Sequence, residues 1–304
     1  MNRTLAAALL LLCALLWGMA FIAQKTAMQH MEPLTFAFVR YFLGAFLVTP
    51  LAVAEYRRQR RKGLLVTREQ WTLIGILSLA FFAGVWLQQA ALQTTSVTNG
   101  GFLTSLYVIL TPVVTYVTLR TRPHLIVYLG APLAMLGIYL LTGADVTKFT
   151  PGDVMLLVGA ICWAVQVALL GQLVKETGLP VFISTINFYF TAVFAMVGAF
   201  ALEHPTLGAV GSGWFEIGYS AIFSTGVAFT LQAIGQQYVP PANAAIVLSS
   251  ESLFAALGGA VFLGERLPPL GYAGAAIIFV AIILVETIPA LRARRAVTSP
   301  GAPG

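Results

Sequence analysis

The sequence predicts an all-α integral membrane protein with ten transmembrane helices, arranged as two inverted repeats of five helices each. Three observations carry this prediction: a scarcity of charge, a series of long apolar runs and an internal repeat. Of the 304 residues, 59% are hydrophobic and 9% are charged, whereas soluble domains carry about 25% charged residues. This composition excludes a water-soluble globular protein.

Apolar runs recur along the whole chain and are separated by charged, proline or glycine residues. A membrane-spanning helix needs about 20 mainly apolar residues. The predicted spans lie near residues 5–28, 34–54, 71–92, 98–119, 125–142, 154–174, 181–201, 215–236, 242–263 and 270–288. A cleaved signal peptide is the alternative for the first run, because Arg3 precedes it. The run is longer than the apolar part of such peptides, so we predict a retained span.

Basic residues gather on one predicted side of the membrane. The net charge is +6, and most Lys and Arg fall into loops that share a side with the N-terminus. Such asymmetry places those loops in the cytoplasm. We therefore predict a multi-pass protein of the inner (plasma) membrane with both termini cytoplasmic, whose basic charge needs no nucleic acid partner. These residues are Arg3, Arg57, Arg58, Arg60, Arg61, Lys62, Arg68, Arg120, Arg122, Lys175, Arg292, Arg294 and Arg295.

The sequence predicts neither a disulfide nor a cofactor or metal site. Cys13 and Cys162 both fall inside apolar runs, where a thiol usually acts as a small packing residue. The end of the chain, residues 292–304, is predicted to be a disordered cytoplasmic tail because it is rich in Pro, Gly and Ser towards its end. The oligomeric state is left open, and a monomer is compatible with the sequence.

The chain repeats itself at offsets of about 145 residues. Trp17 corresponds to Trp163, and Gln88, Asn99, Arg122 and Tyr128 each have an identical residue 144 positions later. The first repeat covers residues 1–145 and the second 150–291. Because each repeat contains five predicted spans, equivalent helices cross the membrane in opposite directions. Inverted repeats of this kind are typical of secondary transporters, which bind solute near the midplane between the repeats.

Five short segments together resemble one known family. They are Ala14–Gly18, Phe38–Tyr41, Asn99–Tyr107, Glu251–Leu257 and Phe262–Arg266. In combination they resemble EamA-type drug/metabolite transporters, over nearly the whole chain. The resemblance implies two EamA repeats, ten helices, cytoplasmic termini and export of amino acids or other metabolites. One departure is visible: Leu263-Gly264-Glu265-Arg266 in the second repeat reads Leu119-Arg120-Thr121-Arg122 in the first, which weakens any role for a glutamate there.

Glu251 is the strongest single site candidate. It lies about nine residues into the ninth predicted span, near the midplane at about 1.5 Å of rise per residue. A carboxyl there is costly unless it faces a partner or a wet cavity. Two interpretations stay open: a protonatable or solute-binding group, and a structural carboxyl at the interface between the repeats. At the offset of 144, Glu251 corresponds to Tyr107.

Other polar residues in predicted spans form the rest of the candidate site. Tyr107 and Thr111 belong to a stripe with Thr104 and Thr115, at spacings that keep one helical face polar. Arg40 either contacts solute, pairs inside the bundle or snorkels outwards. The remaining candidates are Gln89 and Gln93, the pair Trp17 and Gln24, and the pair Trp163 and Gln166; each is also compatible with helix packing.

Other classes of function fit the sequence less well. An intramembrane enzyme needs nucleophiles, acids or metal ligands gathered at one depth, and the chain has no His-Glu-x-x-His, Gly-x-Ser-x-Gly or Walker A motif. A channel or facilitator is the main alternative, although the rings of charge expected of a filter are absent from the sequence. The prediction is therefore a secondary transporter of small solutes, not an enzyme, in which two repeats alternate access to a central cavity.

Overall fold

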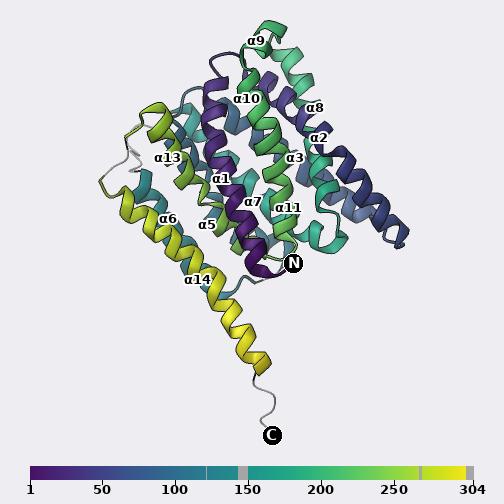
Figure 1. Cartoon of the computed structure of the whole chain (residues 1–304), viewed down its shortest axis with the longest axis vertical. Helices are drawn as coiled ribbons and strands as arrows, with labels where there is room; N and C mark the ends of the chain where they lie inside the picture. The colour runs from purple at the N-terminus through teal and green to yellow at the C-terminus, as the bar shows by residue number, and fades with distance from the viewer. Residues whose placement is uncertain (121, 143–149, 267–268, 299–304) are drawn as a thin grey trace.

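Long helices lie side by side along most of the molecule (Figure 1). The computed structural model describes residues 1–120, 122–142, 150–266 and 269–298. The helices are α1 Arg3–Ala27, α2 Pro33–Arg61, α3 Arg68–Ala91, α4 Val97–Thr104, α5 Tyr107–Leu119, α6 Leu125–Thr142, α7 Pro151–Thr177, α8 Pro180–Leu202, α9 Leu207–Ser212, α10 Trp214–Tyr219, the π-helix η1 Ser220–Phe229, α11 Thr230–Gln236, α12 Pro241–Leu248, α13 Glu251–Leu263 and α14 Gly271–Thr298.

Eight helical segments in the described part of the chain are long and apolar enough to cross a membrane. Three of them combine shorter helices: α4 with α5, α10 with η1 and α11, and α12 with α13. Two further apolar helices, Leu125–Leu141 and Gly271–Val285, are shorter than that criterion requires. The all-helical membrane architecture is therefore confirmed, whereas the count of ten spans stays a prediction.

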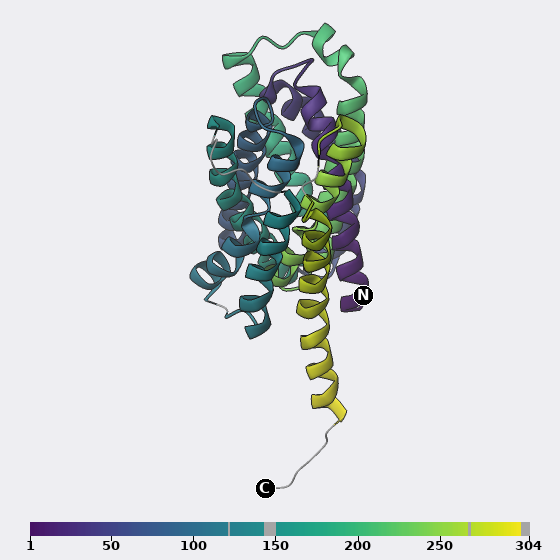
Figure 2. The same ribbon diagram turned by 90° about the vertical axis from the view of Figure 1, so that its left-hand side faces the viewer.

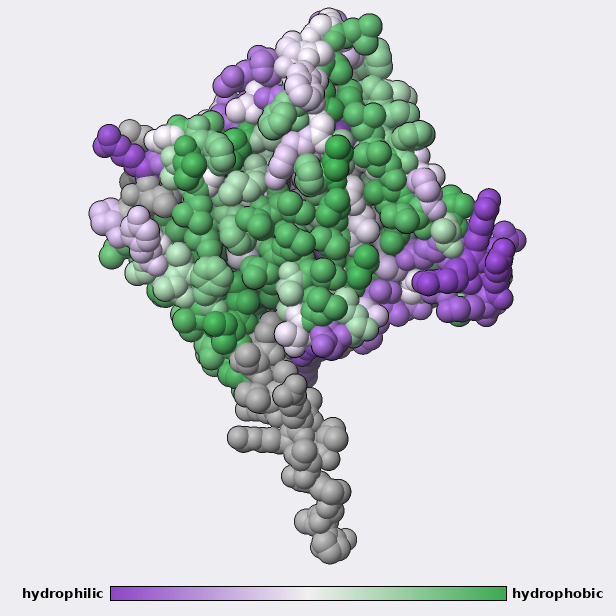
Figure 3. Space-filling view, viewed as in Figure 1, coloured by the Kyte–Doolittle hydropathy of each residue, from purple (hydrophilic) through white to green (hydrophobic). Residues whose placement is uncertain are grey.

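The outer surface of the bundle suits a lipid environment. Large apolar side chains point outwards; on α2, for example, Phe46 is 66% exposed and Leu51 is 63% exposed. Figure 3 shows hydrophobic residues across the middle of the visible face and hydrophilic residues at its edges. A soluble protein rarely exposes so continuous an apolar face, so the surface agrees with the composition.

Two predicted boundaries were wrong. Arg57–Arg61 do not form a loop but the last turns of α2, where basic side chains favourably meet the negative end of the helix dipole. The last helix does not end near residue 288 but extends to Thr298, below the rest of the bundle in Figure 2. Residues 292–298 are thus helical and not a disordered tail, since Ala and Arg, which make up most of this segment, are strong helix formers. Residues 299–304 lie outside the described residues.

Two spans are interrupted at equivalent positions. The break between α4 and α5 lies at Ser105-Leu106, and that between α12 and α13 at Ser249-Ser250. Both breaks use backbone bonds from residue i to i−3, such as Leu106 N to Leu103 O and Ser250 N to Val247 O, which tighten a helix locally. The Ser105 hydroxyl donates to the carbonyl of its own equivalent, Ser249, at 3.4 Å.

Pro112 is not the cause of the first interruption. A proline removes a backbone hydrogen bond of its helix, but Pro112 lies inside α5. The break occurs six to seven residues earlier, at Ser105-Leu106. Pro240-Pro241, in contrast, provide the N-cap and the first residue of α12, where proline is favoured because its missing N–H is not needed.

Helices α2 and α8 cap each other with carboxylates. Glu203, just after α8, accepts hydrogen bonds from the backbone N–H groups of Leu34 and Thr35 in the first turn of α2, both at 2.8 Å. Glu55, near the end of α2, accepts one from Phe182 N–H in the first turn of α8, also at 2.8 Å. The two donors, Leu34 and Phe182, are 148 residues apart, and so are the two acceptors, Glu55 and Glu203. Equivalent contacts therefore form in the two halves.

Helices α1 and α13 cross closely at a glycine. A Cβ atom on Gly18 would lie 2.4 Å from the Cβ of Phe254 and 2.7 Å from the backbone oxygen of Glu251. Small residues at such crossings let two helix backbones approach within a membrane. Gly18 therefore lets the start of α13, which includes Glu251, pack closely against α1.

We predict that Gly18→Ala lowers the stability of the folded protein by about 1–3 kcal/mol, because the methyl group has no space. Gly75→Ala is the matched control, since a Cβ on Gly75 of α3 meets nothing within 4 Å and alanine favours a helix over glycine. Thermal unfolding of both variants in the same detergent checks this. Equal midpoints for the two variants would contradict the crossing.

Candidate functional site

A cavity lies at the centre of the bundle, and helices from both halves of the chain form it. It is narrow, with a volume of about 40 Å³. We call it the central cavity. Its lining residues are Trp17, Phe21, Gln24, Arg40, Tyr41, Val85, Gln88, Thr104, Tyr107, Trp163, Gln166, Val167, Ser224, Phe229, Gln232 and Glu251.

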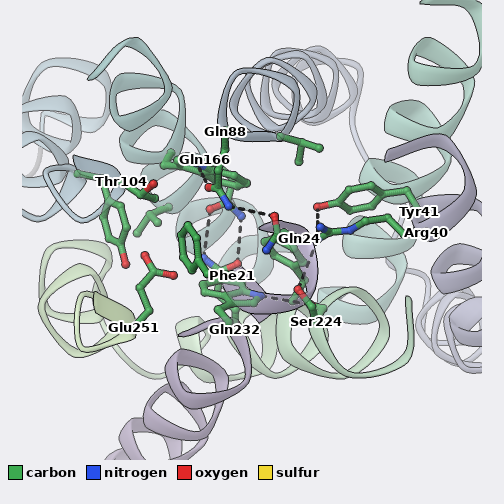
Figure 4. A pocket seen from close by; sticks show the side chains of 16 residues that line it. Phe21, Gln24, Arg40, Tyr41, Gln88, Thr104, Gln166, Ser224, Gln232 and Glu251 are labelled. Atoms are coloured by element: carbon green, nitrogen blue, oxygen red, sulfur yellow. Dashed lines mark hydrogen bonds between the residues drawn. The ribbon is translucent and has the colours of Figure 1, made fainter. Parts of the chain in front are cut away.

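Arg40 provides a buried positive charge at one end of the cavity (Figure 4). It is 3% exposed, and its guanidinium donates to the hydroxyls of Tyr41, Ser224 and Thr225 at 3.2, 3.4 and 3.4 Å. The guanidinium carbon also lies 4.7 Å from the centre of the Tyr41 ring. All these partners are neutral, and no carboxylate contacts Arg40 in the described part of the chain. A charge at this depth is costly unless something compensates it.

The π-helix η1 supplies two of these partners. Ser224 and Thr225 lie in its middle, and the wider turn of a π-helix redirects side chains and backbone groups, often at functional sites. The carbonyl of Ser224 accepts a hydrogen bond from the Trp17 indole at 3.2 Å. Thus η1 connects the cationic end of the cavity to its aromatic wall.

Glu251 lies at the opposite end of the cavity from Arg40 (Figure 4). It is 4% exposed and is the first residue of α13, where the positive end of the helix dipole favours a carboxylate. Its carboxyl group and the buried hydroxyl of Tyr107 interact with each other. Within the described residues, neither the Tyr107 hydroxyl nor Oε1 of Glu251 has another hydrogen-bond partner.

Glutamine side chains occupy the space between the two charged ends (Figure 4). The Trp163 indole donates to Gln88 at 3.1 Å, and the Gln88 amide donates to Gln24 at 3.2 Å. Gln166 and Gln232 exchange two hydrogen bonds of 3.1 Å. These contacts join α1, α3, α7 and α11, so the amides both line the cavity and stabilise the bundle.

Aromatic rings form the rest of the wall. Trp17 and Phe229 lie with ring centroids 4.5 Å apart, and Trp163 stacks on Phe229 at 6.1 Å. Ring faces of this kind suit flat or apolar groups of a solute. The cavity therefore combines a buried guanidinium and a buried carboxyl group with amides and an apolar wall.

The structure places seven of the ten candidate residues around this cavity. They are Glu251, Tyr107, Trp163, Trp17, Gln24, Arg40 and Gln166. The other three lie elsewhere. Gln89 is buried and donates to the backbone oxygen of Gln24 at 3.0 Å, and the Thr111 hydroxyl donates to its own helix at Tyr107 O. Gln93 is exposed and donates to Glu32 at 3.0 Å, at an end of the bundle.

Sequence reasoning missed several residues of the site. Ser224 and Phe229 carry no unusual sequence signal, because a serine and a phenylalanine in an apolar run normally pack against neighbours. Tyr41 was visible only as part of the family-like segment around Arg40. Gln88 and Gln232 had a signal, since they are identical residues 144 positions apart, and that match marks the inner face of both helices.

The model of the EamA-like transporter family matches the chain twice, over residues 4–143 and 150–287. The chain belongs to this family. Its two EamA repeats meet at the central cavity and together cover nearly all of the sequence, so the predicted family and two-repeat organisation are confirmed.

Two curated relatives support the assignment to EamA. One, from Archaeoglobus fulgidus, is named "Uncharacterized transporter"; it is 31% identical over 280 residues, covering 91% of this chain and 84% of its own. The other, "Uncharacterized transporter YwfM" from Bacillus subtilis, is 25% identical over 289 residues, covering 92% and 93%. Both names support transport by this EamA chain, and neither names a solute.

A solved crystal structure has the same fold as this EamA chain. It superposes with a TM-score of 0.75 and covers 97% of this chain and 99% of its own, at 18% sequence identity. At this level of identity the likeness concerns the fold alone.

Proposed function

We propose that this protein is a secondary transporter that exports amino acids or other small metabolites, by alternating access of two inverted five-helix repeats around the central cavity. One observation carries the proposal: Arg40, which no carboxylate contacts within the described residues, and the buried carboxyl of Glu251, paired with the Tyr107 hydroxyl, lie at opposite ends of one cavity. Burial of both groups is costly, and a solute that carries both charges compensates each of them.

Amino acids have the required chemistry. The carboxylate of a zwitterion matches the planar guanidinium of Arg40, which binds carboxylates through two parallel hydrogen bonds. A positively charged group at the far end of the solute, such as that of a basic side chain, matches Glu251 and the Tyr107 hydroxyl. The side chain would then lie against Trp17, Trp163 and Phe229, where apolar and aromatic groups are favourable. Amphiphilic metabolites with the same pair of charges fit equally well.

The contacts between the halves support the inverted arrangement. Glu55 and Glu203 cap each other's helices with an offset of 148 residues (55 to 203), as expected when a twofold axis relates α2 to α8. The contact between the equivalent residues Ser105 and Ser249 suits a position on that axis. Such an axis in the membrane plane would let one repeat rock against the other around a fixed site.

The same proposal includes ten spans in the inner membrane, with Leu125–Leu141 and Gly271–Val285 as the two shorter ones, and both termini in the cytoplasm. The N-terminus, the end of α2 and the end of α14 all lie towards the lower part of Figure 1. Arginines cluster at these three places, which supports a cytoplasmic assignment for this end of the bundle.

Counterflow in proteoliposomes tests the function itself. Vesicles are loaded with unlabelled amino acids or other metabolites, one at a time, and diluted into a trace of the labelled compound. A carrier gives a transient accumulation that saturates with solute concentration. We expect this result for a zwitterionic amino acid. Flux that does not saturate would indicate a channel, and no flux of any zwitterion would contradict the proposed substrate class.

We predict that Arg40→Gln weakens transport of an amino acid at least tenfold but changes transport of its decarboxylated amine much less, because only the amino acid carries a carboxylate. Loss of one charge-assisted hydrogen bond costs about 1.5–3 kcal/mol, or about tenfold to a hundredfold in affinity. Arg40→Lys is the matched control, because it keeps the charge but not the paired donors. An equal loss for both solutes would assign Arg40 to structure alone.

We predict that Glu251→Gln abolishes the pH dependence of transport while the protein still folds, because the amide fills the same space but does not titrate. Counterflow and uptake driven by a proton gradient are compared at several pH values. Glu69→Gln is the control, since Glu69 is exposed in the first turn of α3 and lies outside the central cavity. If Glu251→Gln keeps the original uptake and pH profile, protons are not coupled through this residue.

A further inference from the structure

The helices that open the two interrupted spans start in equivalent ways but are capped differently. Helices α4 and α12 have the same length of eight residues, and at the offset of 144 Val97 corresponds to Pro241, Thr98 to Ala242 and Asn99 to Asn243. A helix leaves its first N–H groups without partners inside the helix, and these groups need an acceptor. The acceptors at the two helices can therefore be compared directly.

At α4, a carboxylate supplied by the chain occupies the N-terminus. Glu265 accepts hydrogen bonds from the N–H groups of Val97 and Thr98, at 2.9 and 3.0 Å, and from the Thr98 hydroxyl. The Ser96 side chain accepts a hydrogen bond from Asn99 N–H at 3.1 Å. Every donor of this first turn is satisfied, so the glutamate in the family-like segment does have a structural role.

At α12, the equivalent donors have no acceptor. Proline at 240 and 241 removes two N–H groups, but the N–H groups of Ala242 and Asn243 remain, and no side chain caps them. The Asn243 side chain donates to Val285 O instead. Within the described residues, the first N–H groups of α12 therefore have no acceptor, whereas those of α4 have one.

The chain cannot supply the missing carboxylate from the equivalent position. Arg120 and Gly264 are 144 residues apart and end their helices in the same left-handed conformation, with φ of 51° and 67°. The residue after Gly264 is Glu265, whereas the sequence after Arg120 has threonine. The carboxylate that caps α4 thus has no counterpart in the first repeat.

A pocket of about 270 Å³ lies at this N-terminus. Three of the described residues that line it have basic side chains: Arg3, Arg122 and His124. Thr115 of α5 also lines it; this residue is 4% exposed, and its hydroxyl has no hydrogen-bond partner. Two backbone donors, a buried hydroxyl and basic side chains therefore meet in one pocket, a combination typical of sites for phosphate or carboxylate.

We propose that this pocket is an anion site, in which a phosphate or carboxylate group occupies the place that the Glu265 carboxylate holds at α4. The backbone N–H groups of Ala242 and Asn243 and the Thr115 hydroxyl donate to the anion, and Arg122 balances its charge. The anion is either a free metabolite or the headgroup of an acidic lipid, because both present the same oxygens at the membrane boundary. The site is separate from the central cavity and does not depend on the proposed transport.

Ligand-dependent thermal stability of the purified, delipidated protein tests this site. One arm titrates inorganic phosphate against chloride at constant ionic strength, and the other compares phosphatidylcholine nanodiscs with and without phosphatidylglycerol. An anion that binds only the folded state raises the unfolding temperature in a saturable way. Saturation with phosphate identifies a free anion, and stabilisation only by phosphatidylglycerol identifies a lipid headgroup; either result supports the site.

Two variants and a matched control locate the effect. Arg122→Gln and Thr115→Val are each expected to weaken the stabilising anion about tenfold, as the loss of one hydrogen bond to a charged group requires. Arg266→Gln is the control, because Arg266 is the equivalent basic residue beside the N-terminus that Glu265 already caps. The proposal is overturned if neither anion stabilises the wild-type protein, or if Arg266→Gln weakens binding as much as the two pocket variants do.

Discussion

A helix that is interrupted inside a membrane must satisfy its free backbone groups without water, and the architecture of this protein follows from that constraint. The breaks at Ser105-Leu106 and Ser249-Ser250 are closed by tighter backbone bonds and by the contact between the two serines. The first residue after each break, Tyr107 in α5 or Glu251 in α13, lines the central cavity. The interruption of each span therefore places one residue of the candidate site in the central cavity.

The two repeats share a backbone plan but differ in chemistry. Carboxylates cap α2 and α8 reciprocally, which ties the halves together at both ends of one helix pair. At the interrupted spans the symmetry is lost, since Glu265 caps α4 while α12 begins with two prolines. At the centre, too, equivalent positions carry different residues: Tyr107 in the first repeat and Glu251 in the second. A duplicated scaffold with unlike side chains can bind an unsymmetrical solute while its halves move in related ways.

Periodic and compositional features were predicted well, because they depend on local physics. Apolar runs located the helices, and the identical residues Gln88 and Gln232, 144 positions apart, marked a face that turns inwards in both repeats. Helix ends were predicted less well: Arg57–Arg61 continue α2 because basic residues are compatible with a helix end. The break at Ser105-Leu106 has no proline to mark it in the sequence, since Pro112 lies inside α5 and the break contacts the other repeat through Ser249.

The sequence by itself determined that the chain is a helical membrane protein of two EamA repeats, because hydropathy, repeat spacing and family motifs are properties of residue order. It also singled out Arg40 and Glu251, since any charge in an apolar run is conspicuous. Only the tertiary structure decided that these two charges lie at opposite ends of one cavity, that η1 supplies the hydroxyls around Arg40, and that Gln93 and Thr111 lie elsewhere. Such relations depend on how helices distant in sequence pack together, which residue order does not specify locally.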